Sequence, residues 1–244
     1  MTDRQVVIIN VGANVSHGSL RSPLFRDHTF EFVPISEGYV DGLPRFSSYK
    51  SKCGRPPEDF IPKGYLNQAM HDDPEFETYT YGDSPENNPR AANLRRLVRG
   101  DSILFLARLV EWNEVDGWGL AGFYLVGELV LDRVVRRSEL VADPELARPV
   151  SHNAHVIRWL LNRYLEPHNF WVFIGSRESR RFVHAVPFDG ELMTRVLVAA
   201  DGSTLKRHKE MTDLLFVGSN TRACRIIDDS NRVRILDEHI RRHC

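Results

Sequence analysis

The sequence predicts an α+β fold in which strands build the core and helices follow toward the C-terminus. Residues 101–110 and 122–135 each place apolar side chains at alternate positions, which is typical of half-buried strands, and we interpret them as an antiparallel pair. Residues 152–164 instead repeat their apolar side chains at helical spacing. With 244 residues, of which 42% are hydrophobic, the chain is long enough to bury a substantial core.

The N-terminal segment combines a short buried strand with a polar loop. Residues 4–9 have the composition of a buried strand, and residues 30–35 look like a second one. Glycines in the loop let backbone approach a ligand closely, and the polar side chains both donate and accept hydrogen bonds. These side chains are Asn10, Asn14, Ser16, His17, Arg21 and Ser22. The loop is therefore either a ligand site at a strand end or a well-capped surface loop.

Residues 36–89 differ from the rest of the chain because they hold seven prolines and little regular periodicity. We expect a long irregular excursion of the kind that forms lids or binding loops. Near its end, Tyr79, Tyr81 and Asp83 lie in a tyrosine-rich strand or turn that leads into an Asp-Ser-Pro helix-start signal.

After residue 89 the apolar side chains again follow the spacing of regular secondary structure. Residues 90–99 predict a short helix that stops at a glycine and leads into the two alternating strands. Trp112 and Trp118 lie in the polar segment between those strands, which we expect to be wider than a tight hairpin. Because glycines flank Trp118, it is harder to bury than Trp159 or Trp171.

The last third of the chain alternates element types. Residues 170–175 predict a buried strand, and a Gly-Ser turn then enters a short basic segment. Residues 189–199 and 220–229 look helical, and the C-terminal DEHIRRHC forms a last helix or a tail. We expect residues 1–244 to form a single domain with a helical C-terminal extension from about 189.

Composition argues against several classes of protein. The net charge of −1 gives no global positive field of the kind a strongly basic nucleic-acid binder has. Only 5 of the 32 basic residues are Lys, so 27 are Arg, which suits recognition of phosphate and base edges, although Arg-rich coding bias gives the same ratio.

No apolar run approaches the roughly 18 residues of a membrane span, so we expect a cytoplasmic protein without membrane contact. Cys53, Cys224 and Cys244 contain no C-x-x-C pair, which argues against a disulfide scaffold or a cysteine zinc site.

The order of a helix, a Gly-Asp step, a strand, a long turn and a second strand resembles the PUA-like superfamily, which includes the EVE and YTH-type domains. The residues that match its pattern are Gly100, Asp101, Phe105, Tyr124, Gly127 and Leu129. The resemblance implies a PUA-like β-barrel core with a long loop insertion and C-terminal helices.

Five segments carry a more specific resemblance, over residues 6 to about 190. They are VGANVSHGSLRSPLF, FEFVPISE, TYGD, NAHVIRW and FIGSRESRRFVHAVPF, and together they resemble the nucleotide modification associated domain 3 family. Its members are named from their genomic company with base-modification systems. The resemblance implies a role in a nucleic-acid modification or defence system, with a partner enzyme of that system as a possible companion.

A PUA-like reader of a modified base takes the base out of the stack, holds it between aromatic or apolar faces and hydrogen-bonds its edge. We expect such a pocket between the N-terminal loop, residues 79–83 and the strands at 101–125. The candidates for binding the nucleotide or base are Asn10, Asn14, Arg21, Ser22, Tyr81, Trp112 and Trp118. The candidates for binding phosphate are Ser176, Arg177, Ser179, Arg180 and Arg181, which follow a strand-ending glycine. The structural alternatives are core tryptophans and a solvated basic face.

An enzyme acting on a nucleotide or base is the second hypothesis. His17 or His155 would serve as acid or base with Asp83 as the orienting carboxylate, for glycosidic-bond or transferase chemistry. His152 and His155 are three residues apart, which is ligand-like spacing, but this pattern is too common to predict a metal site, and no cofactor is predicted. A cavity with a converging His and Asp favours the enzyme, and an aromatic-walled cavity without such a pair favours the reader.

An interaction protein is the third possibility. The acidic segment 71–86 offers a surface for a partner enzyme, and the C-terminal helices offer one for a second copy of the chain. The sequence leaves the oligomeric state open.

Overall fold

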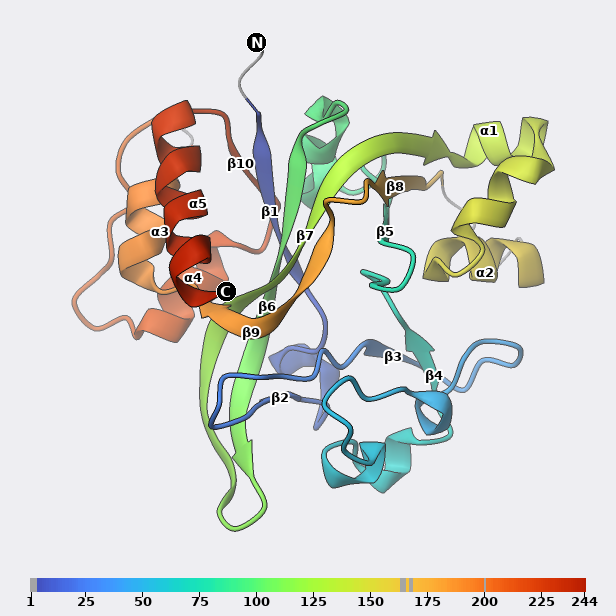
Figure 1. Ribbon diagram of the computed structural model, residues 1–244, viewed down its shortest axis with the longest axis horizontal. Coiled ribbons are helices and arrows are strands. Elements are labelled where there is room, and N and C mark those ends of the chain that lie inside the picture. Colours follow the sequence, from blue (N-terminus) through green and yellow to red (C-terminus); the bar gives the residue numbers. More distant parts are fainter. Residues whose placement is uncertain (1–3, 163–165, 167–168, 200) are drawn as a thin grey trace.

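The computed structural model describes residues 4–162, 166, 169–199 and 201–244. Its centre is a mixed sheet with the strand order β10-β1-β6-β7-β8-β5, to which β2 adds beside β6 and β9 beside β7. These strands are β1 (Val6–Val11), β2 (Ser22–Leu24), β5 (Thr80–Asp83), β6 (Ser102–Asn113), β7 (Gly117–Arg136), β8 (Trp171–Gly175), β9 (Arg180–Pro187) and β10 (Arg225–Ile227). The sheet curls into a half-barrel (Figure 1). The predicted α+β class is confirmed, whereas β5 and β10 end the sheet without pairing to each other in the described chain, so a PUA-like barrel remains a prediction.

Strands β6 and β7 form one long antiparallel hairpin, as the alternating pattern predicted. β7 continues past β6, pairing with β9 near its middle and with β8 over its last residues. The expectation of a wide turn at the tip was wrong, because Trp112 pairs directly with Trp118 and only residues 114–116 turn. Asn113 closes the turn by accepting hydrogen bonds from the backbone amides of Val115 and Asp116 at 3.0 and 2.8 Å.

Strand β1 lies between the short edge strand β10 and the long strand β6. It runs parallel to β6 and antiparallel to β10, and Val6, Val7 and Ile8 are fully buried. The buried Asp101 fixes the start of β6, because its carboxylate accepts hydrogen bonds from the backbone amides of Gln5 at 2.9 Å and Val98 at 2.8 Å. The Gly-Asp step of the sequence thus joins β1 to β6 through one side chain.

The excursion at 36–89 packs with the N-terminal segment around a small apolar cluster separate from the main core. It contains the two-stranded sheet of β3 (Ile35–Gly38) and β4 (Ala69–His71), strand β5, and the 3₁₀ helices Phe46–Ser48, Pro57–Asp59 and Lys63–Tyr65. The cluster consists of Ala13, Leu20, Val33, Phe46, Phe60 and Ile61. The second strand expected at 30–35 was wrong, because only Ile35 belongs to β3, and Val33 packs into this cluster.

Helices cover two sides of the sheet (Figure 1). α3 (Gly190–Val196), α4 (Asp213–Asn220) and α5 (Ser230–His243) lie together beside β1 and β9, and their apolar faces join the main core. α1 (Arg137–Ala142) and α2 (Ala154–Leu161) lie near the β5 end. Residues 163 and 164 of the expected helix fall outside the described residues.

Two helix predictions need correction. The helix expected at 220–229 was wrong, because α4 ends at Asn220 and residues 225–227 pair with β1 as β10. The helix expected at 90–99 is a 3₁₀ helix, Pro89–Arg96, with Asn88 as its cap. Among the described residues no helix is long and apolar enough to cross a membrane.

Candidate functional site

A cavity of about 350 Å³, here called the central cavity, opens where segments from distant parts of the chain meet. The loop at 48–52, residues 70–77, the start of α2 and β9 all contribute to its wall. Its volume lies in the range of about 300–1,000 Å³ that is usual for small-molecule sites. The cavity is therefore large enough for a nucleobase with part of its sugar.

One wall of the central cavity is aromatic. Phe32 and Phe76 meet edge to face, with ring centroids 5.8 Å apart, and Phe76 meets the buried Phe105 in the same way at 5.7 Å. The hydroxyl of Tyr49 donates toward Glu31 and toward the carbonyl oxygen of Phe32, at 2.7 and 2.9 Å. The contacts with the core hold both rings in place; Phe32 is only 4% exposed, so the half-buried Phe76 offers the more accessible ring surface.

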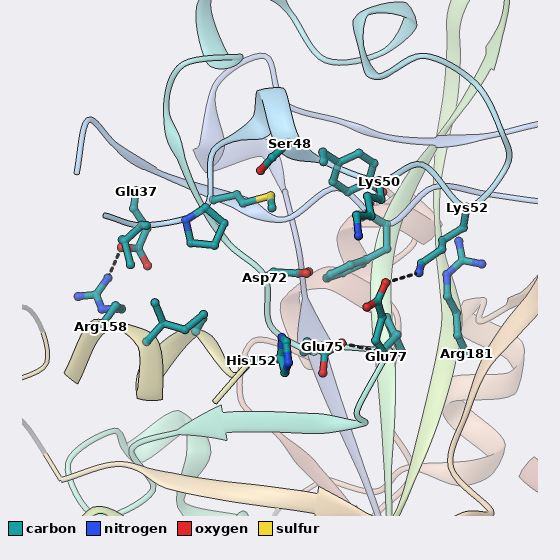
Figure 2. A pocket seen from close by; sticks show the side chains of 18 residues that line it. Glu37, Ser48, Lys50, Lys52, Asp72, Glu75, Glu77, His152, Arg158 and Arg181 are labelled. Carbon is teal, nitrogen blue, oxygen red and sulfur yellow. Dashed lines mark hydrogen bonds and ion pairs between the residues drawn. The ribbon is translucent and has the colours of Figure 1, made fainter. Parts of the chain in front are cut away.

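The carboxylate of Glu31 organises the loop over this wall. Glu31 is fully buried and accepts hydrogen bonds from the Tyr49 hydroxyl, the Ser51 hydroxyl at 2.9 Å and the backbone amide of Cys53. Lys50 and Lys52 alternate with these residues, so the loop directs their ammonium groups toward the cavity (Figure 2).

The charged groups of the cavity are distributed unevenly (Figure 2). Glu37 and Arg158, which form an ion pair, lie at one end. Lys50, Lys52 and Arg181 lie toward the other end. Lys52 pairs with Glu77 at 3.0 Å, whereas Lys50 is exposed and has no ion pair within the described part of the chain.

Carboxyl groups line the middle of the cavity. Asp72 points into it between the two charged ends (Figure 2). Burial, with the nearby Glu75 carboxylate adding to it, raises the pKa of Asp72 to about 7. Glu75 itself is buried and caps the following turn by accepting hydrogen bonds from the amides of Glu77 and Thr78.

Two histidines and three carboxylates are packed together beside the Glu37 end of the cavity. His71 donates from Nδ1 to Glu37 at 2.6 Å, and His155 donates from Nδ1 to Glu166 at 3.1 Å. The Nε2 atoms of the two rings both face Asp73 Oδ2, at 3.9 Å for His71 and 3.6 Å for His155. We call these five residues the histidine-carboxylate cluster.

The backbone and neighbouring side chains hold the histidine-carboxylate cluster in place. The amide of Gly82 donates to both oxygens of Asp73, at 3.1 and 2.8 Å. The ring of His155 stacks on Phe170 with a centroid distance of 5.7 Å. Arg158 donates to Glu166 at 3.0 Å and also pairs with Glu37, so it connects the cluster to the cavity wall.

Burial decides the direction of the pKa shift for the inner residues of this cluster, His71 and Asp73, but not for its outer carboxylates. It lowers the pKa of His71 in spite of the Glu37 carboxylate beside it, so the ring is neutral near pH 7. It also raises the pKa of Asp73 well above the usual range. Burial opposes ionisation of Glu37 too, but the hydrogen bonds from His71 and Arg158 outweigh it and bring the pKa of Glu37 down to about 2.

Two of the predicted base-binding residues line a second cavity, and a third, Trp118, contacts one of them. Asn14 and Arg21 line this hairpin cavity of about 420 Å³, together with Arg108 on β6. The guanidinium of Arg21 lies over Trp118, 5.4 Å from the ring centroid. Arg21 and Arg108 have no ion pair among the described residues, so the hairpin cavity is positively charged and is a separate site from the central cavity.

Asn10, Ser22 and Tyr81 do not line the hairpin cavity, whereas Trp112 lies beside Trp118. The Asn10 side chain faces Thr221 at 3.5 Å, and the Ser22 hydroxyl accepts a hydrogen bond from the amide of Val33 at 3.0 Å. Tyr81 is only 6% exposed and packs against Phe105 and Phe173 in the main core. Trp112 meets Trp118 and Phe25 at the outer end of the hairpin.

The phosphate candidates differ in their accessibility. Ser179 is buried, and its hydroxyl accepts a hydrogen bond from the amide of Val130 at 3.0 Å, which fixes the turn before β9. Ser176 accepts from the amide of Glu178, and Arg180 pairs with Glu128 at 3.6 Å. Arg177 is exposed.

Arg181 is the member of this basic segment that reaches the central cavity. There it also donates to the carbonyl oxygen of Phe30 at 2.7 Å.

The acid-base candidates do not form the expected pair. Asp83 accepts hydrogen bonds from the Tyr81 hydroxyl at 2.9 Å and from the amide of Ser84, whereas the carboxylates beside His155 are Asp73 and Glu166. His17 accepts a hydrogen bond from the amide of Asn14 at 3.0 Å within the N-terminal loop, and burial lowers its pKa.

Sequence reasoning missed His71, Asp73 and the two outer carboxylates of the cluster. The His-Asp-Asp-Pro run at 71–74, directly after a short apolar stretch, was the signal that could have identified the first two. Glu37 and Glu166 carry no local signal, because they become relevant only where the fold brings them to the histidines.

Comparisons with known proteins give one result. No curated protein and no solved structure matches the chain significantly. A family model covers residues 5–187, which include the strands of the half-barrel other than β10, the central cavity and the histidine-carboxylate cluster. The chain therefore belongs to the nucleotide modification associated domain 3 family.

Proposed function

We propose that the central cavity binds a nucleotide, or a modified base within a nucleic acid, as part of a nucleic-acid modification system. The observation that carries this proposal is that one cavity of nucleobase size has an aromatic wall and, at one end, three cationic side chains. Family membership supports the same ligand class, because the family is named for its association with nucleotide modification.

The aromatic wall suits the flat face of a base. Edge-to-face contacts with Phe32 and Phe105 fix Phe76, so a base meets a surface that is already formed. Stacking on such a ring contributes about 1–3 kcal/mol per base. The carboxylate of Asp72, which points into the middle of the cavity, is placed to accept a hydrogen bond from an exocyclic amino group.

The cationic end suits a phosphate. Lys50, Lys52 and Arg181 come from the 48–52 loop and from β9, and they line the same side of the cavity (Figure 2). Because Lys50 has no ion pair among the described residues, a phosphate would not have to displace a carboxylate to reach it. The base would then lie against the rings and the phosphate at the loop.

The test measures equilibrium binding of the full chain to nucleoside monophosphates and to short oligonucleotides with and without modified bases. Lys50→Gln should weaken binding about tenfold or more, since a hydrogen bond to a charged group contributes about 1.5–3 kcal/mol. Phe76→Leu should weaken it by about 5- to 100-fold through lost stacking. Lys63→Gln is the matched control, because Lys63 is an exposed lysine of the same excursion outside the cavity.

Two outcomes would refute this proposal. The first is no binding of any of these ligands by the unchanged protein. The second is binding that Trp118→Ala or Arg177→Ala weakens while Lys50→Gln and Phe76→Leu leave it unchanged. That result would place the ligand at the hairpin tip or on the exposed basic turn.

An enzyme acting on the same class of ligand is the second candidate. The observation that favours it is the closeness of His155 to Asp73 and Glu166, beside the Glu37 end of the cavity. Its acid-base group would be His155, with Glu166 rather than Asp83 as the orienting carboxylate. Incubation with modified and unmodified oligonucleotides, followed by mass spectrometry of the products, separates it from a reader, which leaves them unchanged.

A further inference from the structure

The Nε2 atoms of His71 and His155 lie too far from the Asp73 carboxylate for hydrogen bonds. Their distances from it are close to those between two ligands of one metal ion. Hydrogen bonds from nitrogen to oxygen measure about 2.7–3.2 Å. The Nε2 atoms lie 3.9 and 3.6 Å from Asp73 Oδ2, and all three atoms lie within 4.8 Å of one another. Two ligands each about 2.1 Å from a tetrahedral ion lie about 3.4 Å apart. The two distances to Asp73 exceed that value by about 0.5 and 0.2 Å, and the distance between the two nitrogens is at most 4.8 Å, so a bound ion would draw the ligands slightly closer together.

We propose that His71, Asp73 and His155 bind one divalent first-row transition-metal ion. Two imidazole nitrogens and one carboxylate oxygen are a donor set that such ions take in proteins, with further coordination positions left for water or another ligand. The proposal rests on this cluster alone and does not depend on what the central cavity binds.

The orientation of both rings supports the assignment. Each histidine donates from Nδ1 to a buried carboxylate, His71 to Glu37 and His155 to Glu166, and this leaves the lone pair on Nε2. Metal-binding histidines almost always have such an outer partner, which fixes the tautomer and the ring angle. Here both rings have one, and both lone pairs face the same carboxylate oxygen.

The charged groups of the cluster also support the binding of a cation. Glu37, Asp73 and Glu166 bring three carboxylates into one buried cluster, and Arg158 is the cation that contacts two of them. An ionised Asp73 adds a buried negative charge to this cluster, and a buried charge needs a partner of opposite sign. A divalent ion between the rings supplies that charge next to Asp73, which is otherwise bonded to the amide of Gly82.

The test uses the full chain without a histidine tag, after dialysis against EDTA. Calorimetric titration with Zn²⁺ should show one tight site per chain, and Co²⁺ should give visible absorption bands of a nitrogen- and oxygen-ligated ion. His71→Gln, His155→Gln and Asp73→Asn should each weaken Zn²⁺ binding by more than about 100-fold. Glu166→Gln removes an outer carboxylate and should weaken it by about 10- to 100-fold.

The control is the histidine pair near the C-terminus, of which His239 is half-buried and His243 is exposed. His239 and His243 lie one turn apart on α5, with ring centroids 4.4 Å apart, and they could hold an ion weakly. His243→Ala should leave the tight site unchanged. Far-UV circular dichroism of each metal-free variant verifies its fold, and Zn²⁺ should raise the melting temperature of the unchanged protein but not that of His155→Gln.

X-ray absorption of the Zn²⁺-loaded unchanged protein needs no variant. The proposal predicts imidazole scattering and no sulfur shell. The proposal is overturned if the unchanged protein binds none of these ions, if His243→Ala abolishes binding, or if sulfur ligates the ion. Nucleotide binding measured in EDTA separates the two proposals, because binding that persists there supports the central cavity even when the metal site fails.

Discussion

Gly82 is the position where a single methyl group should disturb the histidine-carboxylate cluster most directly. A Cβ at Gly82 would lie 2.3 Å from Cδ2 of His155, 2.9 Å from the Asn153 amide oxygen and 3.1 Å from the Asp73 carboxylate. Ordinary contact begins near 3.4 Å, so the His155 ring would have to move by about 1.1 Å. Glu166 and the stacked Phe170 hold that ring, so the movement cannot occur without breaking existing contacts.

The expected cost of Gly82→Ala follows from this overlap. Forcing an extra carbon into a packed site costs about 1–3 kcal/mol. The loss of unfolded-state entropy that alanine brings opposes this by about 0.4–1 kcal/mol. For a chain of this length, each kcal/mol lowers the melting temperature by about 2–4 °C. We therefore expect Gly82→Ala to melt several degrees below the unchanged protein.

Gly64→Ala is the matched control for this experiment. A Cβ added at Gly64 would meet no atom within 4 Å, and the φ of this residue is not positive, so alanine there should be neutral or slightly stabilising. Urea unfolding followed by tryptophan fluorescence gives the free energy of unfolding of both variants. If Gly82→Ala were as stable as Gly64→Ala, the described packing around His155 would be incorrect.

Three further predictions concern the scaffold. Asp101→Ala removes the acceptor of two backbone amides and should lower the free energy of unfolding by about 1–3 kcal/mol in urea; a change below about 0.5 kcal/mol would contradict its role. Glu31→Ala should release the 48–52 loop, so that Cys53 reacts faster with a thiol reagent, as mapped by peptide mass spectrometry; an unchanged rate would argue against it. Burial lowers the pKa of His239 below 6.5, so the unfolded chain binds a proton that the folded chain does not as the pH falls through that value. The free energy of unfolding should therefore fall below about pH 6.5, and His239→Gln should make this fall less steep; an identical pH profile would refute it.

The spacing of apolar residues predicted the elements that pair with, or fold within, a neighbouring stretch of sequence. The hairpin of β6 and β7 followed from alternation alone, and α2 followed from helical spacing. β10 could not be predicted in this way, because a three-residue strand has almost no periodicity and gains its conformation from pairing with β1. The long turn was misjudged because the two tryptophans belong to the strands themselves.

The candidate site was predicted only in part, for a related reason. His155 was selected from the sequence, but its partners Asp73 and Glu166 lie in other segments and meet it only in the folded chain. Asp83 is in a tyrosine-rich segment that looked like a site, yet its carboxylate serves the local turn and the buried Tyr81. Sequence identifies the side chains capable of chemistry, while tertiary contacts decide which of them face each other.

The pairing of β10 with β1 affects how the protein can be shortened. The family match ends at residue 187, but the strand that covers the outer edge of β1 lies beyond it, at Arg225–Ile227. A chain cut at the end of the match would expose the backbone amides and carbonyls of the apolar residues Val6, Val7 and Ile8, and such an edge is a template for aggregation. The last 57 residues therefore include the strand that covers the edge of the matched region. A shortened chain that ends at residue 187 would lose this strand.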